Sequence, residues 1–213
     1  MSMPRTAIPG ILALLVILLC CPGGPARAQN LLTNPAFDGP GGLDSWGVQT
    51  GSMVLGADSG SCATSGAIDA TSGLSGGGDQ GFWITSLQCI VVDPVTTPVM
   101  QLAGMYKTTD SVYNRIYLQL FSDTSCSTPT GYSSFVFGGP AAAWNRIAGA
   151  VAIDSPTTSV RVFVETFLQT SGGPAFTVQW DRFYFGVVPE IFLDDFEFES
   201  ASSCHWSNVV GGI

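Results

Sequence analysis

The stretches "NRIYLQLF" at 114–121 and "SVRVFVETF" at 159–167 decide the fold of this chain. In both, every second side chain is apolar, which is the period of a β-strand with one face turned inward. In the first stretch the apolar positions are Ile116, Leu118 and Leu120, and those between them are Arg115, Tyr117 and Gln119. Such strands belong to antiparallel sheets that pack one face on a core and leave the other toward water.

Similar runs recur along the chain between clusters of Gly, Ser, Thr, Asp and Pro. They predict further strands at 52–55, 67–70, 82–92, 99–107, 132–137, 147–153 and 176–186. No helical period is present after the first 28 residues. About ten short strands with few charges predict an all-β sandwich or barrel.

The first residues have the features of a signal peptide. Arg5 is followed by the apolar run "ILALLVILLCC" at 11–21 and by the small residues "ARA" at 26–28. This order predicts cleavage after residue 28 and secretion, to the periplasm, the cell surface or the medium. We therefore expect a signal peptide at 1–28, one β-sandwich domain at 29–188 and an acidic C-terminal tail at 189–213.

The charge balance restricts the partners. Beyond residue 28 the chain keeps five cationic side chains and all 16 acidic ones, for a net charge of −11. So acidic a surface repels phosphate backbones and anionic lipids, which argues against nucleic acid and against membrane insertion once the signal is cleaved. It is compatible with neutral ligands and attracts cations.

Four cysteines follow residue 28: Cys62, Cys89, Cys126 and Cys204. Their even number in an exported chain indicates two disulfides, and four cysteines allow three pairings. If residues 72–79 turn a hairpin, Cys62 and Cys89 are equidistant from its tip and could face each other.

Candidate catalytic residues are few. His205 is the only histidine, and it follows Cys204 directly, so in an extended chain the two side chains point to opposite faces. The acidic residues at 194–199 are neighbours in one segment, whereas a glycosidase needs two carboxylates on opposite sides of a cleft. We therefore predict a non-enzymatic protein.

Two segments resemble jelly-roll carbohydrate-binding modules of families four, nine and twenty-two, which have a galactose-binding-like fold. "NLLTNPAFDGPGGLDSWGV" at 30–48 is similar to their opening strand, with Pro35 in place of the usual Gly and Asp38 in place of Glu. "VQWDRFYFG" at 178–186 is similar to their final strand, in which Asp181 matches the first of two Asp and Arg182 departs from the second. The resemblance implies a jelly-roll of two antiparallel sheets.

The same resemblance implies a structural Ca²⁺ held by Asp38 and Asp181, an arrangement suited to a cation that prefers several oxygen ligands. The alternative is that Asp38 caps a turn and Asp181 pairs with an arginine. It also implies a disulfide between Cys89 and Cys126, because "LQCIVVDP" and "LQLFSDTSCS" resemble a secreted bacterial subgroup with one Cys in each segment. Cys62 would then pair with Cys204.

A sugar-binding surface needs exposed aromatic rings beside polar groups. Arg115, Tyr117 and Gln119 share one strand face, opposite the apolar row, and Trp83 and Tyr113 are further candidates. The competing interpretation for each aromatic residue is packing in the sandwich core.

The tail "FLDDFEFESASSCHWS" at 192–207 resembles a terminal segment of secreted gammaproteobacterial proteins, with two Gly replaced by Asp195 and Phe198. The expected function is a non-catalytic, Ca²⁺-stabilised module that binds a polysaccharide or other glycan. The alternative is a structural or adhesive extracellular protein without a sugar ligand.

Overall fold

The computed structural model describes residues 30–37, 42–59, 66–74, 80–110, 112–168 and 173–187, which form two antiparallel sheets and contain no helix. The eight-stranded sheet consists of β1 (Trp46–Thr50), β4 (Gly73–Leu74), β5 (Gln80–Ser86), β6 (Ile90–Val91), β8 (Tyr113–Phe121), β9 (Pro129–Tyr132), β10 (Val136–Gly138) and β12 (Ser159–Phe167). The five-stranded sheet consists of β2 (Ser52–Ala57), β3 (Gly66–Thr71), β7 (Val99–Thr108), β11 (Ala141–Ala152) and β13 (Thr177–Gly186).

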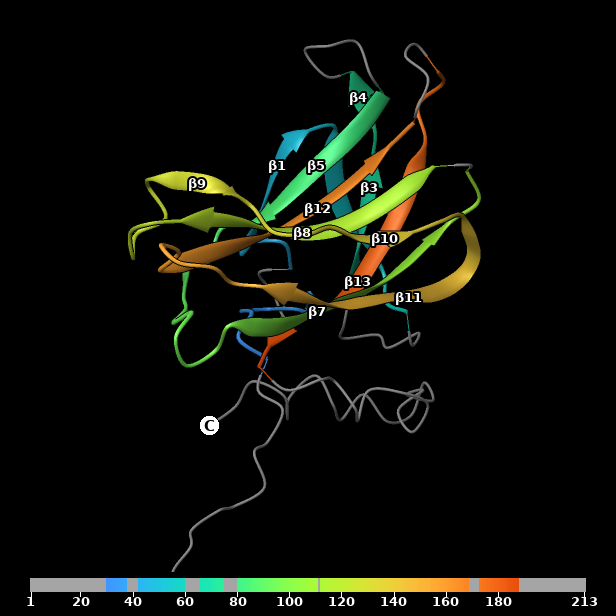
Figure 1. Ribbon diagram of the computed structural model, residues 1–213. Coiled ribbons are helices and arrows are strands. Elements are labelled where there is room, and N and C mark those ends of the chain that lie inside the picture. The colour runs from blue at the N-terminus through green and yellow to red at the C-terminus, as the bar shows by residue number, and fades with distance from the viewer. Residues whose placement is uncertain are drawn as a thin grey trace, which may run out of the picture.

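The main path of the first sheet runs β1-β5-β12-β8-β10, and the second sheet runs β11-β7-β13-β3-β2. Figure 1 shows β5, β12 and β8 side by side in one layer, with β13 and β7 in the other. Strands distant in sequence are therefore neighbours, as in β12, which separates β5 from β8. This is the predicted all-β, jelly-roll sandwich of two antiparallel sheets.

The core lies between the sheets and is built from the predicted alternation. Val160, Val162 and Val164 of β12 are fully buried, as are Ile116 and Leu118 of the neighbouring β8. They meet the inward side chains of the second sheet, which include Leu102, Tyr106, Val178, Trp180 and Phe185. The period-two pattern thus places apolar surface from both sheets in one contiguous cluster.

Two predicted strands are interrupted. The run predicted at 82–92 ends as β5 at Ser86 and resumes as β6 at Ile90, and between the two strands the Gln88 side chain hydrogen-bonds the main chain of Thr33 and Leu31. The run predicted at 132–137 divides into β9 and β10.

The cause of the second interruption is a side chain. Ser133 Oγ accepts the hydrogen bond of the Leu118 amide at 3.0 Å, and Ser133 N–H donates to the Leu118 carbonyl at 2.9 Å. One serine therefore satisfies both main-chain groups of Leu118, and the ladder between β9 and β8 stops there.

The predicted opening strand is not a strand before Trp46, because residues 31–37 form turns, with Asn34 and Phe37 at positive φ. The segment nevertheless lies along the end of β13. Leu31 N–H donates to the Phe185 carbonyl at 2.8 Å, and Phe183 N–H donates to the Pro35 carbonyl at 2.9 Å. The beginning and the end of the sandwich therefore meet.

The predicted Cys89–Cys126 disulfide is confirmed, and it joins the segment before β6 to the loop after β8. Its Cα atoms are 5.7 Å apart, and it closes a loop of 37 residues. Constraint of the unfolded chain by such a loop stabilises the fold by about 4 kcal/mol. The predicted Cys62–Cys204 pair lies outside the described residues and stays a prediction.

Gly104 of β7 gives a stability test. A Cβ there would lie 2.8 Å from the Phe183 ring, which packs on Trp46 and Trp180 with centroids 4.7 and 5.7 Å away. We expect Gly104→Ala to lower the free energy of unfolding by about 1–3 kcal/mol through overpacking. Gly139→Ala, which meets nothing within 4 Å, is the control and should change it by about 0.5 kcal/mol or less. Equal losses in urea unfolding of both variants would contradict this account.

Candidate functional site

The outward side of the eight-stranded sheet carries an unusual number of rings. We call it the aromatic face, and define it by Trp83 of β5, Tyr113, Arg115, Tyr117 and Gln119 of β8, Tyr132 of β9, Phe135, Phe137 of β10, and Arg161, Phe163, Glu165 and Phe167 of β12. All five residues that the sequence predicts as sugar contacts lie on it. These are Trp83, Tyr113, Arg115, Tyr117 and Gln119.

One row of this face crosses four strands in register. Trp83 pairs with Glu165, Glu165 with Arg115, and Arg115 with Phe137. The two outer members are exposed rings, Trp83 at 36% and Phe137 at 61% exposure. Three inter-strand spacings separate them, about 14 Å. The row therefore presents a charged pair between two aromatic side chains.

The charged pair is tightly held. Arg115 Nη2 lies 2.6 Å from Glu165 Oε2, and Arg115 Nε donates to the same oxygen at 2.8 Å. The guanidinium lies 4.2 Å from the Phe135 ring centroid and 5.0 Å from that of Phe167. Glu165 is buried, so its charge is balanced by Arg115 and not by water.

Tyr117 is on the predicted face but is only 7% exposed. Its ring packs against Tyr132, Phe135 and Phe163, with centroids 5.4, 4.9 and 5.5 Å away. Its hydroxyl donates to Glu165 Oε2 at 3.2 Å, and burial, followed by the Glu165 charge, raises the pKa of this phenol well above its usual value. Tyr117 is therefore a neutral support for the pair beneath the exposed rings.

Other predicted residues are open to solvent. Tyr113 is 44% exposed and stacks on Phe167 with centroids 5.8 Å apart, and Gln119 is half-buried in register with Arg161 and Tyr132. Sequence reasoning missed Tyr132, Phe135, Phe137, Phe163 and Phe167. Phe163 and Phe167 have the same parity as Glu165 in β12, so the alternation of that strand could have placed them on this face. Tyr132, Phe135 and Phe137 lie around the break at Ser133, where no single alternation runs through the segment.

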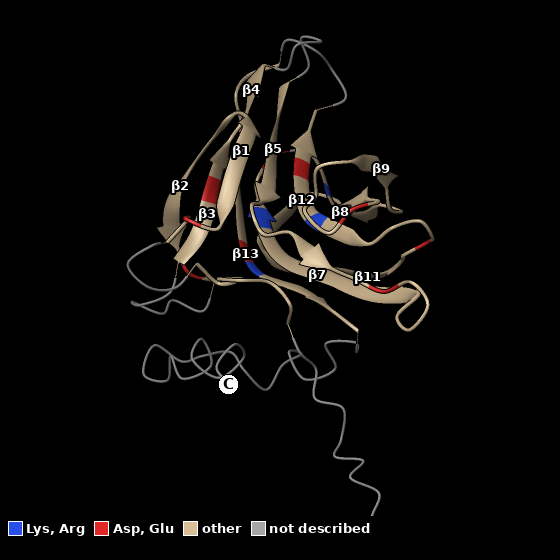
Figure 2. Ribbon diagram, turned by 90° about the vertical axis from the view of Figure 1, so that its left-hand side faces the viewer, with Lys and Arg blue, Asp and Glu red and all other residues tan. Residues whose placement is uncertain are grey.

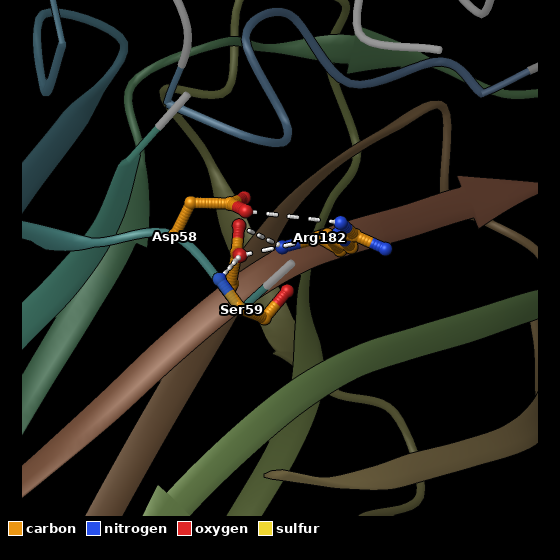
Figure 3. A network of polar contacts seen from close by, with 4 residues as sticks. Asp58, Ser59 and Arg182 are labelled. Carbon is orange, nitrogen blue, oxygen red and sulfur yellow. Dashed lines mark hydrogen bonds and ion pairs between the residues drawn. The ribbon is translucent and has the colours of Figure 1, made fainter. Parts of the chain in front are cut away.

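A second polar site lies where β13 meets the end of β2. Figure 3 shows Asp58, Ser59 and Arg182 gathered there, and the fourth residue of this site is Asp181. Ser59 N–H donates to Asp181 Oδ2 at 2.9 Å, and Arg182 N–H donates to Asp181 Oδ1 at 2.7 Å. Arg182 side-chain nitrogens lie 3.9 Å from Asp58 and 4.0 Å from Asp181. Both carboxylates are fully buried.

The pKa of Asp181 is raised to about 8, chiefly by burial and also by the nearby Asp58 charge, while the hydrogen bond from Ser59 N–H and the Arg182 charge act to lower it. Arg182 has a φ of 48°, at an irregularity in the pairing of β13 with β7. The predicted pairing of Asp181 with an arginine is thus present at 4.0 Å.

The donors at this site fit Ca²⁺ in kind. Asp58 and Asp181 supply carboxylate oxygens, and Ser59 Oγ is buried without a hydrogen-bond partner in the described part of the chain. Asp38, the predicted partner of Asp181, lies outside the described residues, and the described ranges hold no group of three His, Cys, Asp or Glu arranged for a metal. Asp58 is an acidic neighbour that the sequence did not indicate.

Cys204, His205 and the acidic tail at 189–213 also lie outside the described residues, as does the signal peptide predicted at 1–28. Within the residues that are described, no helix is long and apolar enough to cross a membrane.

Solved structures show what the chain is similar to. It aligns with the enzymatically active domain of tailspike protein 4 from bacteriophage CBA120 at 14% identity and a TM-score of 0.52, over 75% of this chain and 21% of that one. This likeness concerns the fold alone, and the chain spans only about a fifth of the tailspike structure. No protein-family model and no curated protein matches the sequence.

Carbohydrate-binding modules, the class that the sequence resembles, are also among the similar structures. A family 11 module from Clostridium thermocellum, in complex with a β-1,3-1,4-mixed-linked tetrasaccharide, has 11% identity and a TM-score of 0.49, over 75% of this chain and 96% of that one. A xylan-binding CBM22-1 domain from Paenibacillus barcinonensis has 10% identity and a TM-score of 0.48, over 76% and 96%.

The raised pKa of Asp181 predicts how stability depends on pH without divalent cations. The native carboxyl keeps its proton up to about pH 8, whereas the unfolded one loses it near 3.8. Stability should therefore fall as pH rises through this window, by up to about 1.4 kcal/mol per pH unit. Asp181→Asn should flatten the slope, and the control Asp154→Asn, at an exposed position, should leave it unchanged. Urea unfolding in chelator between pH 5 and 8 measures this, and parallel slopes for all three proteins would contradict it.

Proposed function

We propose that this protein is a secreted, non-catalytic module that binds a polysaccharide on its aromatic face. The row from Trp83 to Phe137, with two exposed rings around the Arg115–Glu165 pair, is the observation that carries the proposal. An aromatic ring offers a flat apolar surface to the C–H side of a sugar ring, and neighbouring polar groups hydrogen-bond the sugar hydroxyls.

The length of the row fits an extended ligand. Trp83 and Phe137 are about three strand spacings apart, so a chain of several sugars can touch both. Tyr113 adds a third exposed ring two residues along β8 from Arg115. Between the rings, the partly exposed Arg115 presents donors, and the buried Glu165 neutralises its charge. Such a surface suits a ligand rich in hydroxyl groups.

We propose binding without bond cleavage because of the carboxylates of this face. Within the described strands of the eight-stranded sheet, Glu165 is the only acidic residue, and it is occupied by Arg115 and Tyr117. Glycoside hydrolysis uses two carboxyl groups, about 5–10 Å apart according to mechanism. Asp58 and Asp181 belong to the five-stranded sheet side of the molecule and cannot complete such a pair.

Calcium is the second part of the proposal. Asp58, Asp181 and Ser59 would hold the ion by oxygen atoms, and its charge would offset the burial of two carboxylates beside one arginine. A bound ion would supply positive charge and would connect the end of β2 to β13. Its role would be structural, because the site does not lie on the aromatic face.

Single-ring variants test the sugar site. We expect Trp83→Ala and Tyr113→Ala each to weaken binding to soluble xylan or mixed-linkage β-glucan by about tenfold, at a temperature at which circular dichroism shows both variants to be folded. Val95→Ala removes an exposed apolar side chain away from the aromatic face and is the control. Affinity electrophoresis and calorimetry measure the effect. Failure of the intact protein to bind any glycan would favour a structural or adhesive protein instead.

A chelator tests the calcium site. Ca²⁺ should raise the melting temperature, and more at pH 8 than at pH 5, because protonated Asp181 competes with the ion at low pH. Asp181→Asn should reduce the shift strongly, while Asp154→Asn should keep it. A melting curve that is the same with Ca²⁺ and with chelator would exclude the ion.

A further inference from the structure

Arg161 of β12 is the second cation of the aromatic face, and it takes no part in the Arg115–Glu165 pair. It is half-buried, and its Nε atom is fully buried without a hydrogen-bond partner. Its guanidinium lies 5.7 Å from the centroid of the Phe121 ring. Among the described residues no carboxylate lies within 4.0 Å of it, in contrast to Arg115 and Arg182. The Nε atom is enclosed, so a ligand can reach this guanidinium only through its two terminal Nη atoms, for which the described residues supply no acceptor.

The neighbours of Arg161 are suited to a ligand. Gln119 lies opposite it in register, and Tyr132, which is largely exposed, lies opposite Gln119 on the next strand. Phe163, two residues along β12, belongs to the buried ring cluster under Tyr132. An anionic group at Arg161 would therefore have an amide beside it and an aromatic ring within reach.

The charge of this sheet supports an anionic partner despite the acidic chain. The whole chain has a net charge of −9, but the strands of the eight-stranded sheet carry two Arg and one Glu. The strands are almost entirely uncharged in Figure 2, where β12 shows one acidic segment. That acid, Glu165, is four residues from Arg161, about 13 Å along the strand, which exceeds the screening length of about 8 Å at physiological salt.

We propose that the aromatic face recognises a polysaccharide that carries carboxylate groups, such as a chain containing uronic acid residues, and that Arg161 binds the carboxylate. The planar guanidinium matches a carboxylate with two parallel hydrogen bonds, and Gln119 supplies a further donor. This inference rests on the proposed sugar-binding function. It adds to that function the chemical class of the sugar and the residue that selects it.

The test compares each acidic polymer with its neutral form. The probes are alginate, polygalacturonate and glucuronoxylan, each assayed intact and after reduction of its carboxyl groups, so that the backbone stays the same. We expect the intact protein to bind at least one acidic form about tenfold more tightly than its reduced form. Added salt should shrink this preference. Sulfated cellulose is a further arm, and stronger binding to it than to every uronate would overturn the carboxylate assignment.

Three variants locate the effect. Arg161→Gln should remove the preference and leave binding to the reduced polymers intact, whereas Arg161→Lys should retain part of it. Lys107→Gln makes the same change of charge on the five-stranded sheet and should keep the preference. Equal affinity for acidic and reduced polymers, or an unchanged preference in Arg161→Gln, would overturn the inference while the sugar-binding proposal stands. Absence of binding to all forms would overturn both.

Discussion

β12 is buried on both of its faces, and the rest of the molecule follows from this constraint. One face must enter the sandwich core, and its valines do so. The side chains of the other face are largely shielded from water, because β12 is the central strand of the larger sheet and aromatic rings from β8, β9 and β5 lie around it. A glutamate on that second face is tolerated only because an arginine on the adjacent strand reaches the same register position. The core and the aromatic face are thus two sides of one strand.

The sandwich itself could be predicted from the sequence, because alternation is a local property and long strands such as β8 and β12 show it. The break at Ser133 could not, since a serine hydroxyl that replaces a main-chain partner leaves no trace in the apolar pattern. The disulfide between Cys89 and Cys126 came from a family resemblance, since spacing alone left the pairing open.

The candidate sites show the same division between local and long-range information. Arg115, Tyr117 and Gln119 could be placed on one face by parity, but the burial of Tyr117 depends on rings contributed by a later segment. Asp58 lies near Asp181 although more than a hundred residues separate them, and only the pairing of β2, β3 and β13 brings them together. The acidity of the chain is likewise a property of its loops and tail, because the strands of both sheets carry few acids.

The contacts that Arg115 makes with Glu165, Phe135 and Phe167 have a further consequence for molecular recognition. Its side chain is fixed by a carboxylate at one end and by rings on its flanks, so it has already lost most of its rotamer freedom in the unliganded protein. A flexible arginine would give up that freedom each time a ligand arrived, and part of the interaction energy would be consumed in ordering it. Here the ordering is completed during folding, so any ligand of this face would meet an arginine whose side chain is already fixed.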